Sequence, residues 1–319
     1  MKFLVIGGNA AGMSAASRVK RKSPDTEVVV LEQTHEVSYG ACGLPYYVAG
    51  LNNNLDLMRI RKADQFLASG VDLRLGCDVT GADFTAKTVS YTDENGEAHV
   101  ESYDKLLIAT GSSPKVPPIP GIRQKNIFPL KTLDQATALK LALESNPKSV
   151  VIVGGGYIGL ELAEACILQK VPEIHIVEAL DRLLNVFDPE FSEMVKAELE
   201  KNGVHIHLGE RVMSFEGEDD KVTAVKTDKD CYAADVVILS IGVSPNTRFL
   251  PEGIEKLGNG ALVTDASMKT SVPDVYAAGD CASVWSKLLD KPMYIALGTN
   301  ANKQGRLAGD AVLGKNVRF

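Results

Sequence analysis

The hydrophobic positions of the chain follow one pattern twice. In each copy a short, continuous apolar run leads into a glycine-rich turn, a helical stretch and a second apolar run that a glutamate closes. Short apolar runs bounded by glycine are typical of strands buried on both faces of a parallel sheet. Each copy therefore predicts a βαβ unit. The predicted elements are strands 2–6 and 28–31 around a helix at about 10–22, and strands 150–153 and 174–177 around a helix that ends near residue 169.

The two copies also continue alike. Each has a segment of alternating apolar and polar positions broken by turn residues, at 79–100 and at 212–227, which predicts a small antiparallel β insertion. Each then has a further apolar strand that ends in glycine, at 104–111 and at 234–242. Agreement at all these landmarks indicates duplication of one fold. The sequence thus predicts an α/β protein with two Rossmann-like, three-layer nucleotide-binding domains.

A proline-rich stretch at residues 114–121 is the clearest linker of the chain. It lies where the first nucleotide-binding domain should hand over to the second. After the second copy, the chain has a short predicted strand within 272–280 and a helical segment at about 296–313. We therefore expect the second domain to be inserted in the first, with residues 1–116 and 246–319 forming the first domain and residues 117–245 the second.

The two glycine turns carry the first candidate chemistry. Residues 154–159 have the complete GxGxxG spacing, whereas in residues 7–12 Asn9 replaces the middle glycine. Such a turn seats a pyrophosphate on the N-terminus of the following helix, and an acid about 20 residues further on binds a ribose hydroxyl. Glu32 and Glu178 are the acids in that place. Two matched turns predict two separate nucleotides.

Composition excludes several classes of function. The chain has 319 residues, enough for two domains, with 45% hydrophobic and 24% charged residues and a net charge of −7. An acidic balance without a basic stripe argues against a nucleic-acid surface. No apolar run reaches the roughly 18 residues that a membrane span needs, and the amino end lacks the extended apolar segment of a signal peptide. We therefore expect a cytoplasmic protein that binds neither nucleic acid nor membrane.

Five cysteines are scattered too widely for a disulfide framework or a zinc site, so no metal is expected. One of them has a special context. Cys42 lies between Ala41 and Gly43, just before Leu44 and Pro45, which can open a helix. Orphan N–H groups and the positive end of a helix dipole stabilise a thiolate, which is the reactive form of the sulfur. The alternative interpretation of Cys42 is a buried structural cysteine.

In order and spacing these motifs resemble the FAD- and NAD(P)-dependent pyridine nucleotide-disulfide oxidoreductases, and the resemblance covers essentially the whole chain. It implies an FAD-binding turn at 7–12, a hinge at 109–111, an NAD-binding turn at 154–159 and, within 278–280, a carboxylate that holds the ribityl chain of FAD. The implied cofactors are FAD and NADH. The cofactor-binding residues expected on this basis are Gly7, Gly8, Ala10, Ala11, Gly12, Glu32, Gln33, Ser38, Val79, Ala109, Thr110, Gly111, Gly154, Gly156, Tyr157, Ile158, Gly159, Glu178, Gly242, Gly279 and Asp280.

Cys42 decides the branch of that family. Members with a dithiol carry a second cysteine five positions further on, where this chain has Tyr47. The chain thus resembles the single-cysteine branch of coenzyme A disulfide reductases, NADH-dependent persulfide reductases, NADH oxidases and NADH peroxidases. The run Cys-Gly-Leu-Pro-Tyr-Tyr is similar to the first two, and Ala10 stands where the oxidases and peroxidases have a histidine. The resemblance implies that reducing equivalents pass from NADH through FAD to Cys42, which reduces a small disulfide or persulfide such as coenzyme A disulfide.

Glu178 favours NADH over NADPH. Its carboxylate can accept hydrogen bonds from the hydroxyls of the adenosine ribose, but it would repel a 2'-phosphate. The residues that follow, 179–181, include no arginine, and Arg182 is the nearest one.

Other residues have a functional and an ordinary interpretation. The resemblance places Glu161 near the nicotinamide and flavin as a second catalytic residue, although the helix dipole also favours a carboxylate at that position. Arg18, Arg21 and Lys22 lie on one side of the first helix, where they either bind the 3'-phospho-ADP of coenzyme A or form a solvated face. The resemblance also implies Asn302 near the reactive sulfur. These last four are the expected substrate-binding residues.

Members of this family continue past the counterparts of Gly305 and Arg306 into a C-terminal dimerisation domain, so we expect the chain to be a fragment that stops at that boundary. A homodimer is expected of a full-length member. Three other functions stay open. They are an NADH oxidase that uses a sulfenic acid at Cys42, an electron-transfer reductase for a redox-protein partner in which the cysteine is idle, and a flavin-binding redox sensor.

Overall fold

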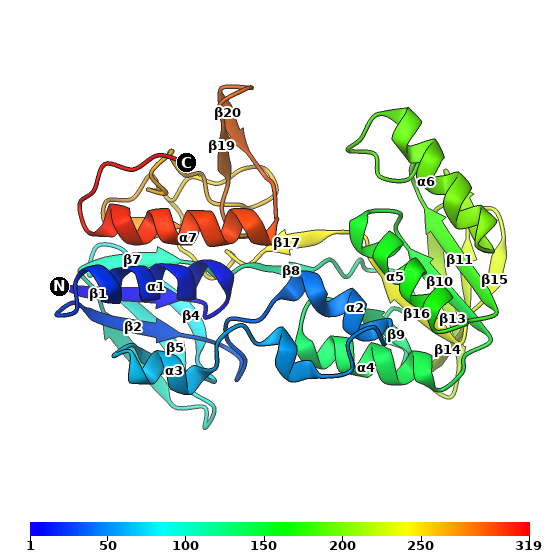
Figure 1. The fold of residues 1–319 in the computed structure, drawn as a ribbon, viewed down its shortest axis with the longest axis horizontal. Helices are drawn as coiled ribbons and strands as arrows, with labels where there is room; N and C mark the ends of the chain where they lie inside the picture. Colours follow the sequence, from blue (N-terminus) through cyan, green and yellow to red (C-terminus); the bar gives the residue numbers. More distant parts are fainter. The chain divides into compact units, whose positions relative to one another are not determined.

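The computed structural model describes residues 1–319, which fold into two compact units. The first unit contains residues 1–40, 59–113 and 244–319, and the second contains residues 41–58 and 114–243. Each unit has a five-stranded parallel sheet with helices and a small antiparallel sheet packed against it (Figure 1). The chain passes from the first unit to the second within a short strand, β8 (Ser112–Pro114), and returns within another, β17 (Val243–Pro245).

The sheet of the first unit has the strand order β18-β7-β1-β2-β3, and all its pairings are parallel. Helices α1, α3 and α7 cover one face, and the antiparallel sheet β4-β5-β6 covers the other. Both faces are therefore apolar, which explains the continuous apolar runs in the sequence. The elements are β1 (Lys2–Ile6), β2 (Glu27–Leu31), β3 (Asp72–Arg74), β7 (Lys105–Ile108), β18 (Val275–Ala277), α1 (Ala10–Lys22), α3 (Ala63–Ala68), α7 (Gly298–Val312), β4 (Asp78–Asp83), β5 (Thr88–Thr92), β6 (Ala98–Ser102), β19 (Val284–Ser286) and β20 (Lys291–Met293).

Helices α1 and α7 approach each other closely because α7 has glycines at the contact. A Cβ atom on Gly305 would lie 2.2 Å from the carbonyl oxygen of Ala11, and one on Gly309 would lie 3.0 Å from that of Ala15. Only a residue without a side chain fits the first of these positions. The pairing fixes α7 alongside the first glycine turn, which opens α1.

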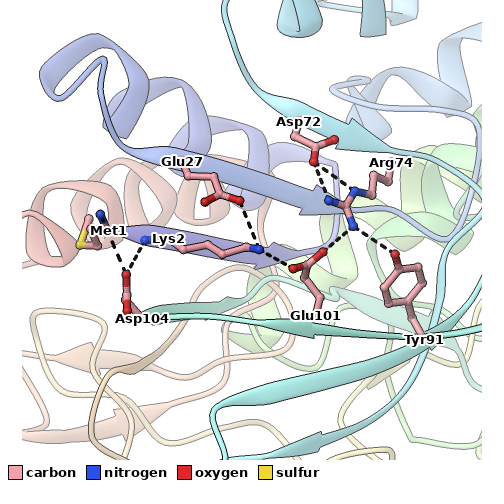
Figure 2. A network of polar contacts seen from close by, with 8 residues as sticks. All are labelled: Met1, Lys2, Glu27, Asp72, Arg74, Tyr91, Glu101 and Asp104. Carbon is pink, nitrogen blue, oxygen red and sulfur yellow. Dashed lines mark hydrogen bonds and ion pairs between the residues drawn. The ribbon is translucent and has the colours of Figure 1, made fainter.

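A polar network joins the antiparallel sheet of the first unit to the central strand β1 and the edge strand β3 of its parallel sheet (Figure 2). Glu101 on β6 is its centre, because Lys2 on β1 and Arg74 on β3 both donate hydrogen bonds to its carboxylate. Arg74 also donates to the hydroxyl of Tyr91 on β5, at 3.1 Å. Burial opposes ionisation of Glu101, but the hydrogen bonds from Lys2 and Arg74 outweigh it and lower the pKa of this carboxyl.

The sheet of the second unit has the order β12-β11-β10-β16-β9, again with parallel pairings throughout. The antiparallel sheet β13-β14-β15 packs on one face, and helices α4, α5 and α6 pack on strands of the parallel sheet. The elements are β9 (Ile127–Pro129), β10 (Ser149–Val153), β11 (Glu173–Glu178), β12 (Val204–Leu208), β16 (Val236–Leu239), α4 (Leu133–Glu144), α5 (Tyr157–Leu168), α6 (Pro189–Lys201), β13 (Val212–Glu218), β14 (Lys221–Thr227), β15 (Cys231–Ala233) and, from residues 41–58, α2 (Leu44–Val48) with the 3₁₀ turns Ala41–Gly43 and Leu55–Met58.

A chain of polar side chains ties the two sheets of the second unit together. His175 Nδ1 lies 3.0 Å from His207 Nε2, and His207 Nδ1 lies 3.0 Å from the hydroxyl of Tyr232. The hydroxyls of Tyr232 and Thr227 both donate to Oε1 of Glu210. Since the Tyr232 proton is used there, His207 Nδ1 is the donor to the Tyr232 oxygen. Burial lowers the pKa of both histidines, so the chain is built from neutral imidazoles.

The elements predicted from the hydrophobic pattern agree with those observed, with small differences in length. The predicted insertion at 79–100 overlaps all three strands of the sheet β4-β5-β6, whereas that at 212–227 covers two of the three strands of the sheet β13-β14-β15. The final helix begins at Gly298. The boundaries between the two compact units fall after Ser113 and after Val243, and residues 41–58 belong to the second unit. The domain limits at 116/117 and 245/246 stay a prediction. None of the helices combines the length and the apolarity that crossing a bilayer requires.

Candidate functional site

The first glycine turn joins β1 to α1 and leaves no room for side chains. Gly7 has a φ of +108°, and a Cβ atom there would lie 2.2 Å from the carbonyl oxygen of Ala109. A Cβ atom on Gly12 would lie 1.9 Å from the carbonyl oxygen of Gly7. Asn9, which replaces the middle glycine, accepts a hydrogen bond from the backbone N–H of Tyr39 at 3.1 Å, and its side chain does not cap α1. The first N–H groups of α1 are thus left for an anionic ligand.

Glu32, at the end of β2, faces this turn. Its Oε2 accepts a hydrogen bond from the N–H of Gly8 at 2.6 Å, and its Oε1 accepts bonds from the N–H and the hydroxyl of Thr34 at 2.8 and 2.7 Å. The carboxylate is therefore oriented by the backbone of the turn. Nearby, the N–H of Ser38 donates to the carbonyl oxygen of Gly8 at 3.0 Å, and Gln33 donates to Asp78, the residue before Val79, at 2.9 Å.

Three motifs far apart in the sequence meet at one edge of the first sheet. Strand β1 ends at Ile6 beside Ile108 of β7, and Ile108 in turn pairs with Ala277 of β18. The first glycine turn, the segment 109–111 and the segment 278–280 follow these three residues directly. Because the carboxyl ends of parallel strands form one edge, the three motifs lie side by side there. The register thus brings together most of the residues expected to bind FAD.

The segment 278–280 is held by contacts within the first unit. Gly279 has a φ of +83° and donates its N–H to Gln304 of α7 at 2.9 Å. Asp280 Oδ2 accepts a hydrogen bond from the hydroxyl of Ser112 at 3.0 Å, and its carbonyl oxygen accepts one from the hydroxyl of Tyr294 at 3.0 Å. Burial, and then the charge of Asp280, raise the pKa of Tyr294 to about 12, so this hydroxyl stays a donor.

The hinge segment is pinned where the chain returns to the first unit. The hydroxyl of Thr110 donates to the carbonyl oxygen of Asn246 at 2.7 Å, and the side-chain amide of Asn246 donates back to the carbonyl oxygen of Thr110 at 3.1 Å. Gly111 has a φ of +66°, and its carbonyl oxygen accepts a hydrogen bond from the N–H of Asn246 at 3.0 Å. Three residues that hold these segments, Asn246, Ser112 and Tyr294, could not be identified from sequence patterns, because most of their partners are distant along the chain.

The second glycine turn repeats the geometry of the first. A Cβ atom on Gly154, which has a φ of +107°, would lie 2.7 Å from the carbonyl oxygen of Ser240, and one on Gly159 would lie 2.1 Å from that of Gly154. Glu178 accepts hydrogen bonds from the N–H groups of Gly155 and Leu180 at 2.6 and 2.8 Å. Strands β10 and β16 end in register at residues 153 and 239, which puts Gly242 at the same edge of the sheet. The second unit thus contains a glycine turn with the same geometry and an oriented carboxylate, as the first unit does.

Helix α5 begins in this second turn and carries three further predicted residues, Tyr157, Ile158 and Glu161. Gly156 is its N-cap, and the side chain of Tyr157 is 52% exposed. Glu161 reaches solvent, but the surrounding protein removes part of its hydration, and this together with the charge of Glu164 raises the pKa of Glu161. Ile158 lies in the same first turn of the helix.

Cys42 lies in the 3₁₀ turn Ala41–Gly43 and is exposed. The expected helix follows it as α2, with Gly43 as N-cap and Pro45 in the first turn, so Cys42 precedes the helix rather than beginning it. A Cβ atom on Gly43 would lie 2.5 Å from the Cε atom of Met58, which explains the small residue at this position. The interpretation of Cys42 as a buried structural cysteine is wrong.

The other cysteines lack these features. Cys77, Cys166 and Cys281 are buried, and burial raises the pKa of each thiol, that of Cys166 to about 12. Cys231 is exposed on β15, and all five thiols are free. Cys42 is thus the exposed thiol that precedes a helix and lies among small residues.

The basic residues of α1 differ in their surroundings. Arg18 forms an ion pair with Asp310 of α7, with its Nη2 at 2.6 Å from Oδ2, and this pairing raises the pKa of Arg18. Arg21 and Lys22 are exposed. Asn302 is also exposed, and its Oδ1 accepts a hydrogen bond from the hydroxyl of Ser14 at 2.9 Å. The charge of Arg18 is therefore partly neutralised within the protein, whereas those of Arg21 and Lys22 face solvent.

Comparison with known proteins places these features in a family. Residues 1–305 match the family model described as pyridine nucleotide-disulphide oxidoreductase. The chain is 37% identical to an NADH oxidase of Enterococcus faecalis over 312 residues, which cover 97% of this chain and 70% of that protein. It is 38% identical to an NAD(P)H coenzyme A polysulfide/persulfide reductase of Pyrococcus horikoshii over 320 residues, which cover 100% of this chain and 71% of that protein.

A solved structure has the same fold. The water-forming NADH oxidase of Lactobacillus brevis, in a structure bound to NADH, superimposes with a TM-score of 0.95 at 34% identity, covering 100% of this chain and 71% of that one. The comparisons confirm the predicted α/β fold and the resemblance to FAD- and NAD(P)H-dependent oxidoreductases. The roles of individual residues, the location in the cytoplasm and the state of assembly stay predictions.

Proposed function

Because the chain belongs to the pyridine nucleotide-disulphide oxidoreductase family, we propose that it reduces a small disulfide or persulfide, such as coenzyme A disulfide, with electrons from NADH. The observation that carries the proposal is the environment of Cys42. This thiol is exposed, lies just before a helix, and has Tyr47 at the position where a second cysteine would resolve a dithiol. A single exposed thiol can exchange with a small disulfide, but it cannot form an internal disulfide with a near neighbour.

The reaction consumes one NADH, one proton and one disulfide and yields NAD⁺ and two thiols. The Cys42 thiolate attacks a sulfur of the substrate, the substrate S–S bond breaks, and the first thiolate leaves and takes up a proton. Bound FAD would supply the two-electron link between NADH and the resulting mixed disulfide. Reduction of that disulfide releases the second thiol and returns Cys42 to its thiolate form. In the persulfide reaction the same attack would transfer a sulfane sulfur to Cys42.

We assign the first glycine turn, Glu32 and Asp280 to FAD, and the second glycine turn with Glu178 to NADH. The residues fit these ligands, since each turn offers free helix N–H groups for a pyrophosphate and an oriented carboxylate for ribose hydroxyls. Glu178 would repel a 2'-phosphate, and Arg182, the nearest arginine in the sequence, donates a hydrogen bond to the carbonyl oxygen of Asn185. NADH is therefore the proposed donor.

The remaining predicted residues keep their proposed roles, except that Arg18 becomes a weaker candidate for substrate binding than Arg21 and Lys22. Glu161, whose pKa is raised, is assigned to the nicotinamide side of the reaction. Arg21 and Lys22 are the better candidates for the phosphates of coenzyme A, because Arg18 is engaged with Asp310. Asn302 is assigned to the neighbourhood of the reactive sulfur.

An NADH oxidase that uses a sulfenic acid at Cys42 is the second candidate. The 37% identity to the NADH oxidase of E. faecalis favours it. Against it stands Ala10, at the start of α1, which offers no group to move a proton while an O–O bond breaks. We therefore rank disulfide reduction first.

The products formed from NADH distinguish the two candidates. With FAD bound and oxygen excluded, we expect NADH oxidation to depend on added coenzyme A disulfide and to yield two thiols per NADH. In air without disulfide, NADH oxidation should be slow. Fast oxygen consumption without disulfide, with formation of water or hydrogen peroxide, would establish the oxidase and overturn the proposal.

A further inference from the structure

The segment that carries Cys42 is fastened to two helices of the second unit. Helix α2, two residues after Cys42, packs against α4 and α5. The first anchor is Lys140 of α4, which contacts the segment at two points. Its Nζ donates a hydrogen bond to Oδ1 of Asn53 at 3.0 Å and lies 5.3 Å from the centre of the Tyr47 ring. One side chain therefore contacts the cysteine segment at two points, one inside α2 and one beyond it.

Lys140 is unusual for a lysine on a surface helix. Its side chain is only 10% exposed, and its charge is compensated by Glu144 one turn further on, at 3.0 Å. Removing an ammonium group from water is costly, so such a lysine is retained where several partners replace the lost hydration. A glutamate on the same helix, such as Glu144, can pair with a lysine that stays exposed, so this ion pair does not explain the burial of Lys140. The carbonyl-type oxygen of Asn53 and the face of the Tyr47 ring are the partners that require the cysteine segment to be in this position.

Gln169 provides the second anchor. It is the C-cap residue of α5, and its Nε2 donates to the carbonyl oxygen of Val48, the last residue of α2, at 3.0 Å. A Cβ atom on Gly50 would lie 3.1 Å from this nitrogen and 3.6 Å from Nζ of Lys140. The chain turns sharply at Gly50, with a φ of +79°, and both anchors close around that turn.

We propose that Lys140 and Gln169 are positioning residues for Cys42. They fix α2 and the turn after it, and through the short connection to α2 they fix the place from which the sulfur reacts. The proposal rests on the proposed function of Cys42. The proposal distinguishes reduction of the flavin by NADH from the sulfur steps at Cys42. The anchors belong to the sulfur steps, because they contact the segment after Cys42 and not the glycine turns. A displacement of about 1 Å of a reacting group can cost on the order of 10²-fold in rate.

The experiment compares four variants of the full chain loaded with FAD. Lys140→Met and Gln169→Leu remove the anchors at similar volume, and Lys140→Arg keeps a charge that can donate to Asn53 and stack on Tyr47. Lys196→Met is the matched control, since Lys196 of α6 also pairs with a glutamate one turn on, at 3.7 Å. Two kinetic experiments are made. The first measures the rate at which NADH bleaches the flavin without disulfide, and the second measures kcat with coenzyme A disulfide together with the KM values for that disulfide and for NADH. Hydrogen exchange of residues 44–52 is measured alongside.

We expect Lys140→Met and Gln169→Leu to bleach at rates within about twofold of the unsubstituted protein, while kcat for the disulfide falls about 10- to 100-fold with little change in KM for NADH. Hydrogen exchange should accelerate in residues 44–52 and stay unchanged in β10–β12. Lys140→Arg should restore most of the disulfide rate, and Lys196→Met should behave like the unsubstituted protein.

Two results would overturn the positioning role. In one, Lys140→Met matches Lys196→Met in disulfide turnover and in exchange of residues 44–52. In the other, bleaching and disulfide turnover fall together and exchange accelerates throughout the second unit, which means that Lys140 only supports the fold. Failure of the proposed function would be recognised by a different result, because disulfide turnover would then persist in a variant that lacks the Cys42 thiol. The exchange measurement does not depend on the identity of the substrate.

Discussion

A Cys42→Ser variant should bind FAD and be bleached by NADH, yet lose disulfide-dependent NADH oxidation by at least about 10³-fold. A serine hydroxyl is a poor nucleophile toward sulfur and cannot form the mixed disulfide through which the electrons reach the substrate. The first and second glycine turns are unaffected by the change, since Cys42 lies outside both. The measurement is NADH consumption with coenzyme A disulfide, with oxygen excluded, beside the rate of flavin bleaching.

The chain offers a matched control in Cys231→Ser. Cys231 is the other exposed free cysteine, but it lies on the strand β15 and not in a turn that leads into a helix. We expect this variant to keep full disulfide turnover. If Cys42→Ser keeps its turnover as well, the thiol is idle, and the chain passes electrons directly from flavin to an acceptor such as a redox protein.

The second large effect concerns the glycine turns. Gly12→Ala should lose bound FAD, because the added Cβ atom would lie 1.9 Å from the carbonyl oxygen of Gly7 and the turn cannot keep its shape. Overpacking of this kind costs about 1–3 kcal/mol, which corresponds to a decrease of roughly 5- to 150-fold in affinity. FAD content is read from the ratio of flavin to protein absorbance. Gly81→Ala, on β4 with no atom within 4 Å of the added Cβ, is the control that should retain FAD.

Gly159→Ala makes the same change in the second turn, where the Cβ atom would lie 2.1 Å from the carbonyl oxygen of Gly154. This variant should keep FAD but lose bleaching by NADH. The pair of variants tests the assignment of one nucleotide to each unit even if one of them folds poorly. Loss of FAD from Gly159→Ala together with retention of FAD by Gly12→Ala would reverse the assignment.

Local chemistry explains why much of the fold could be predicted from the sequence. Strands such as β1 and β10 are buried on both faces, so their apolar runs are continuous, and both glycine turns have backbone contacts that no side chain would allow. The short range of these effects makes them visible in a single sequence. The meeting of the first glycine turn with residues 109–111 and 278–280 depends instead on the parallel register of β1, β7 and β18. That register joins distant segments, and only the family resemblance indicated it.

Other features of the site could not be predicted because they depend on partners far along the chain. Lys140 has the sequence context of an ordinary surface lysine, and its burial follows from the position of residues 44–53, about ninety residues earlier. Arg18 belongs to a basic stretch that suggests a phosphate site, but Asp310 of α7 holds its guanidinium. In both cases a charged side chain is committed by packing between elements that the sequence pattern alone does not bring together.

The single-sulfur mechanism is tested most directly by the mass of the peptide that contains Cys42. This mass is measured for the protein as isolated and again after treatment with NADH, with oxygen excluded. We predict an adduct with the mass of a small thiol such as coenzyme A, or of additional sulfur atoms, that NADH removes. A disulfide between Cys42 and another cysteine of the same chain, or an adduct that NADH leaves in place, would contradict the mechanism.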